Sequence, residues 1–171
     1  MSSHDKLIFL AGVRNMANAY AKAVYFGIIA GMRSMSAPAL VSHHYAKENS
    51  PEVDDSLFNF MSSAKVAGAL KVLAAGEIFA DKSTFIPNRI DKGPLAFRAI
   101  SGSICGATLC AAERERVGIG AIAGGIAAIA SAFACYHLRR TIGENTNVPD
   151  ILLGVAEDAI VVGLGSKILK D

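Results

Sequence analysis

Charged residues are scarce in this chain, and tryptophan is absent from it. Charged side chains make up 19% of the 171 residues, whereas soluble domains carry roughly 25%. Hydrophobic residues reach 52%, and the mean hydropathy is +0.38. The formal net charge of only +2, without a recognition motif, argues against nucleic acid as a partner. The composition therefore favours a membrane protein.

Cysteines and catalytic motifs are also sparse. Cys105, Cys110 and Cys135 all fall inside apolar segments, and this odd number predicts buried free thiols rather than a disulfide framework. GxSxG, Walker, HExxH and CxxC motifs are absent. His43 and His44 are adjacent and cannot share a helix face, so they make a poor metal site. We therefore expect no enzymatic activity, no cofactor and no metal.

Five apolar segments could enter a bilayer. The strongest, Val117 to Leu138, has no formal charge, and its helix would measure about 33 Å, enough to span hydrocarbon. The others are shorter or carry charges, and lie at about 19–42, 64–80, 94–112 and 148–169. Together they predict an all-α polytopic membrane bundle of four or five helices, forming one domain over residues 19–171. A soluble alanine-rich helical bundle is the alternative.

Residues 1–18 are predicted to form a separate amphipathic segment. Apolar residues recur at helical spacing from Leu7 to Tyr20, with Arg14 and Asn18 between them, which is typical of an interfacial helix. The short apolar run is not followed by an obvious small-residue cleavage site, so we expect this segment to be retained. A disordered or partner-bound terminus is the alternative.

One short pattern occurs twice inside apolar segments. Residues Met32–Ala37 read Met-Arg-Ser-Met-Ser-Ala, and residues Phe97–Gly102 read Phe-Arg-Ala-Ile-Ser-Gly. A second pair of stretches, Val72–Glu77 and Leu152–Glu157, is also similar. These likenesses predict an internal duplication, with chance similarity between helices rich in Ala and Gly as the alternative.

Charged residues inside the apolar segments predict a polar centre. An arginine is costly to bury in hydrocarbon, and a carboxylate partner would neutralise it. By pattern, Glu77 and Glu157 are the nearest partners for Arg33 and Arg98. Such pairs would clamp helices together or line a cavity that binds an anion, a proton or a lipid headgroup. The residues predicted to form the polar centre are Arg33, Ser34, Ser36, Glu77, Asp81, Arg98, Ser101, Glu157 and Asp158.

Pro38 predicts a kink or a break in the first segment, close to Arg33. A proline removes a backbone donor and clashes with the preceding turn. Broken helices in transporters place free backbone groups and helix ends at a central site. A simple kink is the alternative.

Several of these stretches resemble the domain of unknown function 4126 family. They are Gly27–Ser34 followed by Pro38, Glu77–Lys82, Pro94–Gly106 and Glu157–Ala159. The resemblance covers about Ala19 to Leu169. It implies a small bacterial integral membrane protein without an assigned activity, and it offers no catalytic residues to carry over.

The sequence leaves two main functions open. A small transporter or channel-like protein built around the polar centre is the first, and a structural, assembly or lipid-binding subunit is the second. Small residues four apart, such as Gly27 and Gly31, predict tight helix packing. We therefore expect membrane lipids as partners, and a homo-oligomer or a larger complex. If all five segments span, eight basic residues face six across the membrane, which favours a cytoplasmic N-terminus at the bacterial inner membrane.

Overall fold

The computed structural model describes residues 3–48, 53, 56–80, 91–145 and 150–169, and over this range the protein is helical, without a strand. The all-α class predicted from the sequence is therefore confirmed. The apolar segment predicted at residues 64–80 is a helix with the same bounds. The helices are α1 (Ser3–Met32), α2 (Ser36–Glu48), the short 3₁₀ helix η1 (Asn59–Ser62), α4 (Ala64–Ala80), α5 (Lys92–Ala112), α6 (Val117–Asn145) and α7 (Asp150–Ile168).

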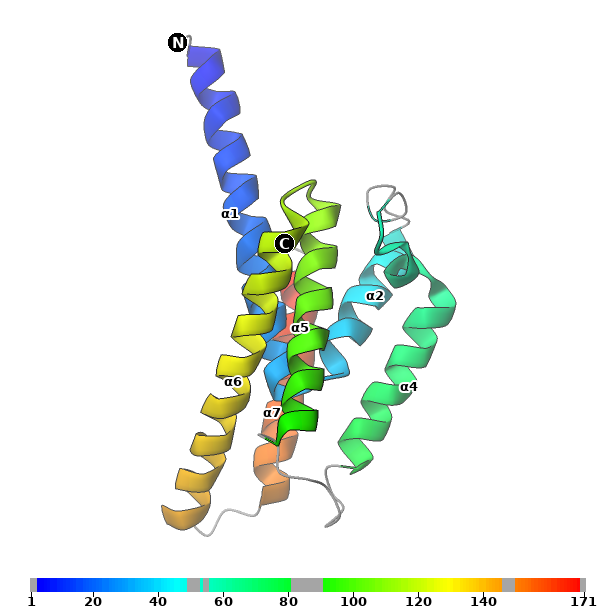
Figure 1. The fold of residues 1–171 in the computed structure, drawn as a ribbon, viewed down its shortest axis with the longest axis vertical. Coiled ribbons are helices and arrows are strands. Elements are labelled where there is room, and N and C mark those ends of the chain that lie inside the picture. Colours follow the sequence, from blue (N-terminus) through cyan, green and yellow to red (C-terminus); the bar gives the residue numbers. More distant parts are fainter. Residues whose placement is uncertain (1–2, 49–52, 54–55, 81–90, 146–149, 170–171) are drawn as a thin grey trace.

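Helices α1, α5 and α6 pack side by side and form the centre of the bundle (Figure 1). Glycines set the distance between them. A Cβ atom added at Gly102 of α5 would lie 2.6 Å from the carbonyl oxygen of Gly124 in α6, and one added at Gly27 of α1 would also meet that carbonyl. Because glycine lacks a side chain, the backbones approach closely, as the small-residue spacing predicts.

The remaining helices surround this centre. Helix α2 contacts α5 and α7, and α4 packs against α2 and η1. Figure 1 shows α4 at the edge of the molecule, with α2 between it and α5. The start of α1, the turn between α5 and α6 and the C-terminal end of α7 share one end of the bundle, hereafter the N-terminal end.

The first predicted segment is not one continuous helix. Helix α1 ends at Met32, and α2 turns back toward the end from which α1 came (Figure 1). Pro38 lies in the first turn of α2, has no N–H for the Ser34 carbonyl, and would clash with that carbonyl in a continuous helix. The kink or break predicted close to Arg33 and Pro38 is therefore a break, and residues 19–42 are divided between two helices.

Helix α1 is continuous across the predicted boundary at residue 18. Its first half extends beyond the other helices (Figure 1). The predicted N-terminal segment and the start of the bundle therefore share one helix.

Two helices are long and apolar enough to cross a membrane, α5 over Lys92–Ala112 and α6 over Val117–Glu144. In α6 the mean hydropathy is 2.0 and only 33% of the apolar stretch is buried, unlike the largely buried core helix of a soluble protein. Its exposed apolar side chains include Ile119, Ile122, Ile126, Ile129 and Phe133. The other described helices do not meet this criterion, so the predicted four or five spans are not confirmed.

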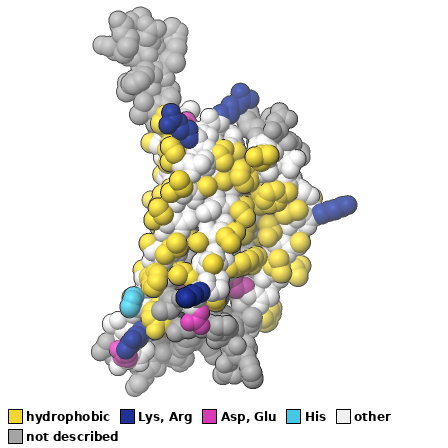
Figure 2. Space-filling model, in the orientation of Figure 1, with side chains coloured by type: hydrophobic (Ala, Val, Ile, Leu, Met, Phe, Trp, Pro, Cys, Tyr) yellow, Lys and Arg dark blue, Asp and Glu magenta, His cyan; other side chains and the backbone are white. Residues whose placement is uncertain are grey.

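The surface of the molecule is divided by polarity. Figure 2 shows apolar side chains over the middle of the visible face and charged side chains mostly toward its two ends. One basic side chain projects from the right edge at mid-height. An apolar band between polar ends matches the hydrocarbon and interfacial layers of a bilayer.

Candidate functional site

Glu77 of α4 binds the turn that immediately precedes α2 at the helix break. Its Oε1 accepts hydrogen bonds from the backbone N–H of Ser34 (2.9 Å) and the Ser34 hydroxyl (2.7 Å). Its Oε2 accepts one from the backbone N–H of Met35 (2.8 Å). Backbone N–H groups at the start of a helix have no acceptor within that helix, and a negative charge suits this end of the helix dipole. Glu77 therefore supplies both the hydrogen-bond acceptors and the negative charge that are favourable at this position.

Arg98 of α5 caps the other side of the break, the C-terminal end of α1. Its Nη1 donates to the carbonyl oxygens of Gly31 and Met32, the second at 3.0 Å. Its side chain is buried, and a cation is favourable where helix carbonyls end. One turn later on α5, the Ser101 hydroxyl donates to the Ser34 carbonyl, which Pro38 cannot serve. The broken helix thus receives a cation at one end and an anion at the other.

The two copies of the repeated pattern contact each other but differ in conformation. Met32–Ala37 contains the break, whereas Phe97–Gly102 lies within the continuous helix α5. Arg98 and Ser101 from the second copy satisfy carbonyl groups of the first. The second copy therefore supplies side-chain donors, and the first copy supplies the backbone carbonyl acceptors. The internal duplication stays a prediction.

Two ion pairs connect α7 to the break and to α6. Arg33 Nε lies 2.7 Å from Asp158 Oδ1, an ion pair by distance whose geometry is not that of a hydrogen bond. Arg139 Nη2 pairs with Glu157 Oε2. Arg33 is 3% exposed and Glu157 is 7% exposed, so both charges lie inside the protein. Neutralisation by a nearby opposite charge is what burial of such groups requires.

Glu77 and Glu157 contact groups that the sequence pattern did not indicate. Glu77 caps backbone groups, because the break supplies N–H donors that a continuous helix would have used. Glu157 pairs with Arg139, which the sequence placed only at the flank of an apolar segment. Helix α6 continues to Asn145 and so carries Arg139 beside α7. Its position directly after the apolar run was the signal that could have identified Arg139.

Gly154 of α7 lies between two guanidinium groups, which the sequence did not reveal. A Cβ atom added there would lie 3.6 Å from Nη2 of Arg33 and 3.6 Å from Nη2 of Arg139. Beside it, a cavity of about 170 Å³ between α6 and α7 is lined by Arg139, Glu157 and apolar side chains that include Met32. Two cations thus converge next to the break, with Asp158 and Glu157 neutralising them.

The other predicted site residues are accounted for as follows. Ser36 is buried as the first residue of α2. Asp81 lies outside the described residues. The three cysteines are free, with Cys105 and Cys110 buried as predicted and Cys135 half-buried. Among the described residues, His, Cys, Asp and Glu side chains do not form a group of three able to hold a metal ion.

Comparison with known proteins identifies a family. Neither the curated proteins nor the solved structures contain a significant match to this chain. The family described as Domain of unknown function (DUF4126) matches over residues 21–168. That range includes the break and the helices that contact it, and the match confirms the resemblance seen in the sequence. The chain therefore belongs to the DUF4126 family.

Proposed function

We propose that the protein is an integral membrane protein in which α4, α5, α6 and α7 cross the bilayer and the α1–α2 hairpin enters and returns. Helices α4 and α7 have 17 and 19 residues, which corresponds to about 25–29 Å and is close to the hydrocarbon thickness. Both expose large apolar side chains, among them Val72 and Phe79 of α4 and Leu152 and Leu164 of α7. Such faces suit lipid better than water.

Because the α1–α2 hairpin returns to the N-terminal end, it changes which basic residues lie at each end of the bundle. Lys22, Lys47, Lys65, Arg114, Arg116 and Lys167 belong to the N-terminal end of the bundle. Among the residues whose side chains the structure describes, Lys92 at the start of α5 and Arg139 and Arg140 near the end of α6 belong to the opposite end, and Lys71 lies near the middle of α4. Under the positive-inside rule this asymmetry favours a cytoplasmic N-terminus, and the family resemblance favours a bacterial inner membrane.

We further propose that the protein is a transporter or channel for small anions. The observation that carries this proposal is the convergence of Arg33 and Arg139 on Gly154, beside a broken helix. Guanidinium groups bind carboxylates and phosphates through paired hydrogen bonds. Helix breaks beside buried charges are the usual construction of solute sites in transporters.

The ion pairs indicate how an anion would be accommodated. Asp158 and Glu157 neutralise the two arginines in the structure. An anion arriving through the cavity between α6 and α7 would compete with Glu157 for Arg139. This competition would expose and cover the positive charge of Arg139 in turn.

The experiment compares two ion pairs whose arginines, Arg139 and Arg140, are adjacent in α6. The double substitution Arg139→Gln and Glu157→Gln removes the buried pair without leaving a lone charge. We expect uptake of isotope-labelled chloride, formate or phosphate by proteoliposomes to fall about tenfold or more, since a charge-assisted contact is worth about 1.5–3 kcal/mol.

The matched control is Arg140→Gln with Glu144→Gln, whose side chains are 63% and 62% exposed. This variant should transport like the parent protein. Equal uptake by both double variants would contradict a role for the buried pair, and an inactive parent protein for all three anions would contradict the proposed function itself.

A second candidate function, a structural or assembly subunit, is favoured by the outer face of α4. A Cβ atom added at Gly68 or Gly76 would meet nothing within 4 Å among the described residues, and Val72 and Leu73 are exposed. Glycine faces of this kind allow another membrane helix to approach. Purification in mild detergent tests this alternative: a stable copurifying subunit, or a homo-oligomer lost in Gly76→Leu, would support it.

A further inference from the structure

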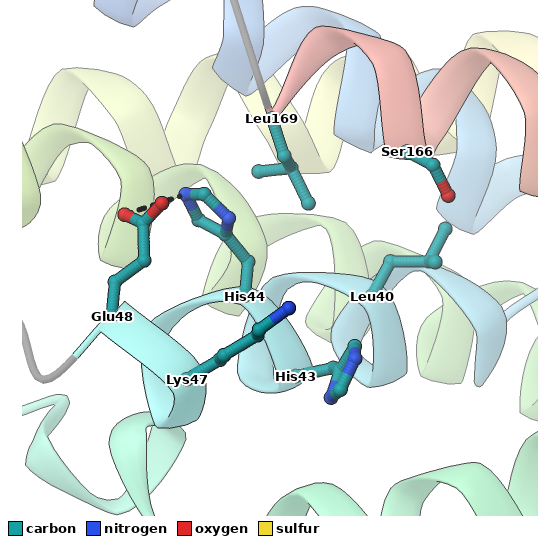
Figure 3. A pocket seen from close by; sticks show the side chains of 7 residues that line it. All are labelled: Leu40, His43, His44, Lys47, Glu48, Ser166 and Leu169. Atoms are coloured by element: carbon teal, nitrogen blue, oxygen red, sulfur yellow. Dashed lines mark ion pairs between the residues drawn. The ribbon is translucent and has the colours of Figure 1, made fainter.

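A second cavity lies away from the helix break, between the C-terminal ends of α2 and α7. Its volume is about 470 Å³. Figure 3 shows Lys47 and Leu40 on α2 across from Ser166 and Leu169 of α7, with His44 and Glu48 at one side. The cavity belongs to the N-terminal end of the bundle, the end with more basic residues.

The lining of this cavity is divided into a polar and an apolar part. Leu40 and Leu169 supply apolar surface, and Lys47 and Ser166 supply an ammonium group and a hydroxyl group. Surfaces of this composition suit an amphipathic molecule whose polar head carries acceptor oxygens. A detergent-like or lipid-like ligand fits both parts, whereas a free ion would use only the polar part.

Each of the two histidines that line the cavity contacts a neighbouring charged side chain. Lys71 Nζ lies 2.9 Å from His43 Nδ1, and because an ammonium group only donates, Nδ1 accepts. His44 Nε2 lies 3.2 Å from Glu48 Oε2. His43 is thus engaged with Lys71 of α4, and His44 holds the Glu48 carboxylate.

Lys47 and Glu48 supply a positive and a negative charge to the lining of the cavity. Burial lowers the pKa of His44, and the nearby Glu48 only partly opposes this effect. Glu48 has a side chain that is 58% exposed and directed at His44 (Figure 3). Lys47 therefore stands as the cation available to a ligand.

We propose that this cavity binds the phosphate group of a membrane phospholipid, with Lys47 and Ser166 donating to the phosphate and Leu40 and Leu169 contacting the start of an acyl chain. The site is separate from the helix break, so the proposal holds or fails independently of anion transport. Its position at the basic end places it in the leaflet where anionic headgroups and basic side chains attract each other.

The test measures thermal protection of the purified full chain in detergent by three added probes: phosphatidylglycerol, diacylglycerol and inorganic phosphate. We expect phosphatidylglycerol to protect at a concentration about tenfold below that of diacylglycerol, since one charge-assisted contact accounts for that ratio. Lys47→Gln should abolish this preference. The control Lys65→Gln, an exposed lysine at the same end, should retain it.

Three results would overturn the proposal. The first is equal protection of the parent protein by both lipids, and the second is an unchanged preference in Lys47→Gln. The third is full protection by inorganic phosphate alone, which would assign the site to a free anion. If Lys47→Gln does not fold, Ser166→Ala serves as the variant, with a smaller preference expected and an unchanged preference against the proposal.

Discussion

Replacing Glu77 by alanine is expected to lower the free energy of unfolding by about 3 kcal/mol or more, since each unsatisfied buried polar group costs about 1–3 kcal/mol. The substitution would remove the acceptor for the backbone N–H groups of Ser34 and Met35 and for the Ser34 hydroxyl. Unfolding can be followed with a thiol-reactive fluorophore, because Cys105 and Cys110 are buried and free.

Two variants control this experiment. Glu77→Gln keeps a carbonyl oxygen at the site and should lose less stability than the alanine variant. Glu144→Ala removes an exposed carboxylate and should change stability by no more than about 0.5 kcal/mol. If Glu77→Ala unfolds at the same temperature as Glu144→Ala, then Glu77 does not hold the helix break.

Replacing Gly106 by alanine is expected to destabilise the protein by about 1–3 kcal/mol through overpacking. The added Cβ atom would meet the backbone carbonyl of Gly120, with its carbonyl carbon at 2.9 Å and Ala23 Cβ at 3.4 Å. Backbone atoms cannot rotate away as a side chain can, so α5 and α6 would have to separate. The measurement is the same thiol-exposure transition.

The control is Gly118→Ala, in α6 close to Gly120. A Cβ atom at Gly118 would meet nothing within 4 Å among the described residues. Alanine favours helix over glycine by about 1 kcal/mol, so this variant should be as stable as the parent protein or more stable. Destabilisation of equal size in both variants would show that close packing of α5 on α6 does not set the stability.

Helix positions were largely predictable because hydrophobic segments and breaking residues are local signals. Helix α4 coincides with its predicted range, and Pro38 marked the break. What the sequence did not show was the return of α2 toward the N-terminal end. Chain direction after a break depends on the neighbours that receive the helix ends, here Glu77 and Arg98, which lie far along the chain.

Partners within the polar centre were harder to predict than its members. Adjacent residues on a helix point about 100° apart, so sequence alone could not decide whether Arg33 would meet Glu157 or Asp158. The choice of Asp158 follows from how α7 is rotated against α1 and α6. Gly154 carried no signal at all, because its importance comes from the two guanidinium groups beside it.

The most direct test of the account is anion uptake by proteoliposomes containing Gly154→Val, compared with Gly163→Val on the same helix. Valine at position 154 would fill the space between Arg33 and Arg139, whereas position 163 has nothing within 4 Å among the described residues. We expect uptake of labelled chloride, formate or phosphate to fall about tenfold or more only in Gly154→Val, provided both variants show the thiol-exposure transition of folded protein. Equal uptake by the two folded variants would contradict passage of an anion between these arginines.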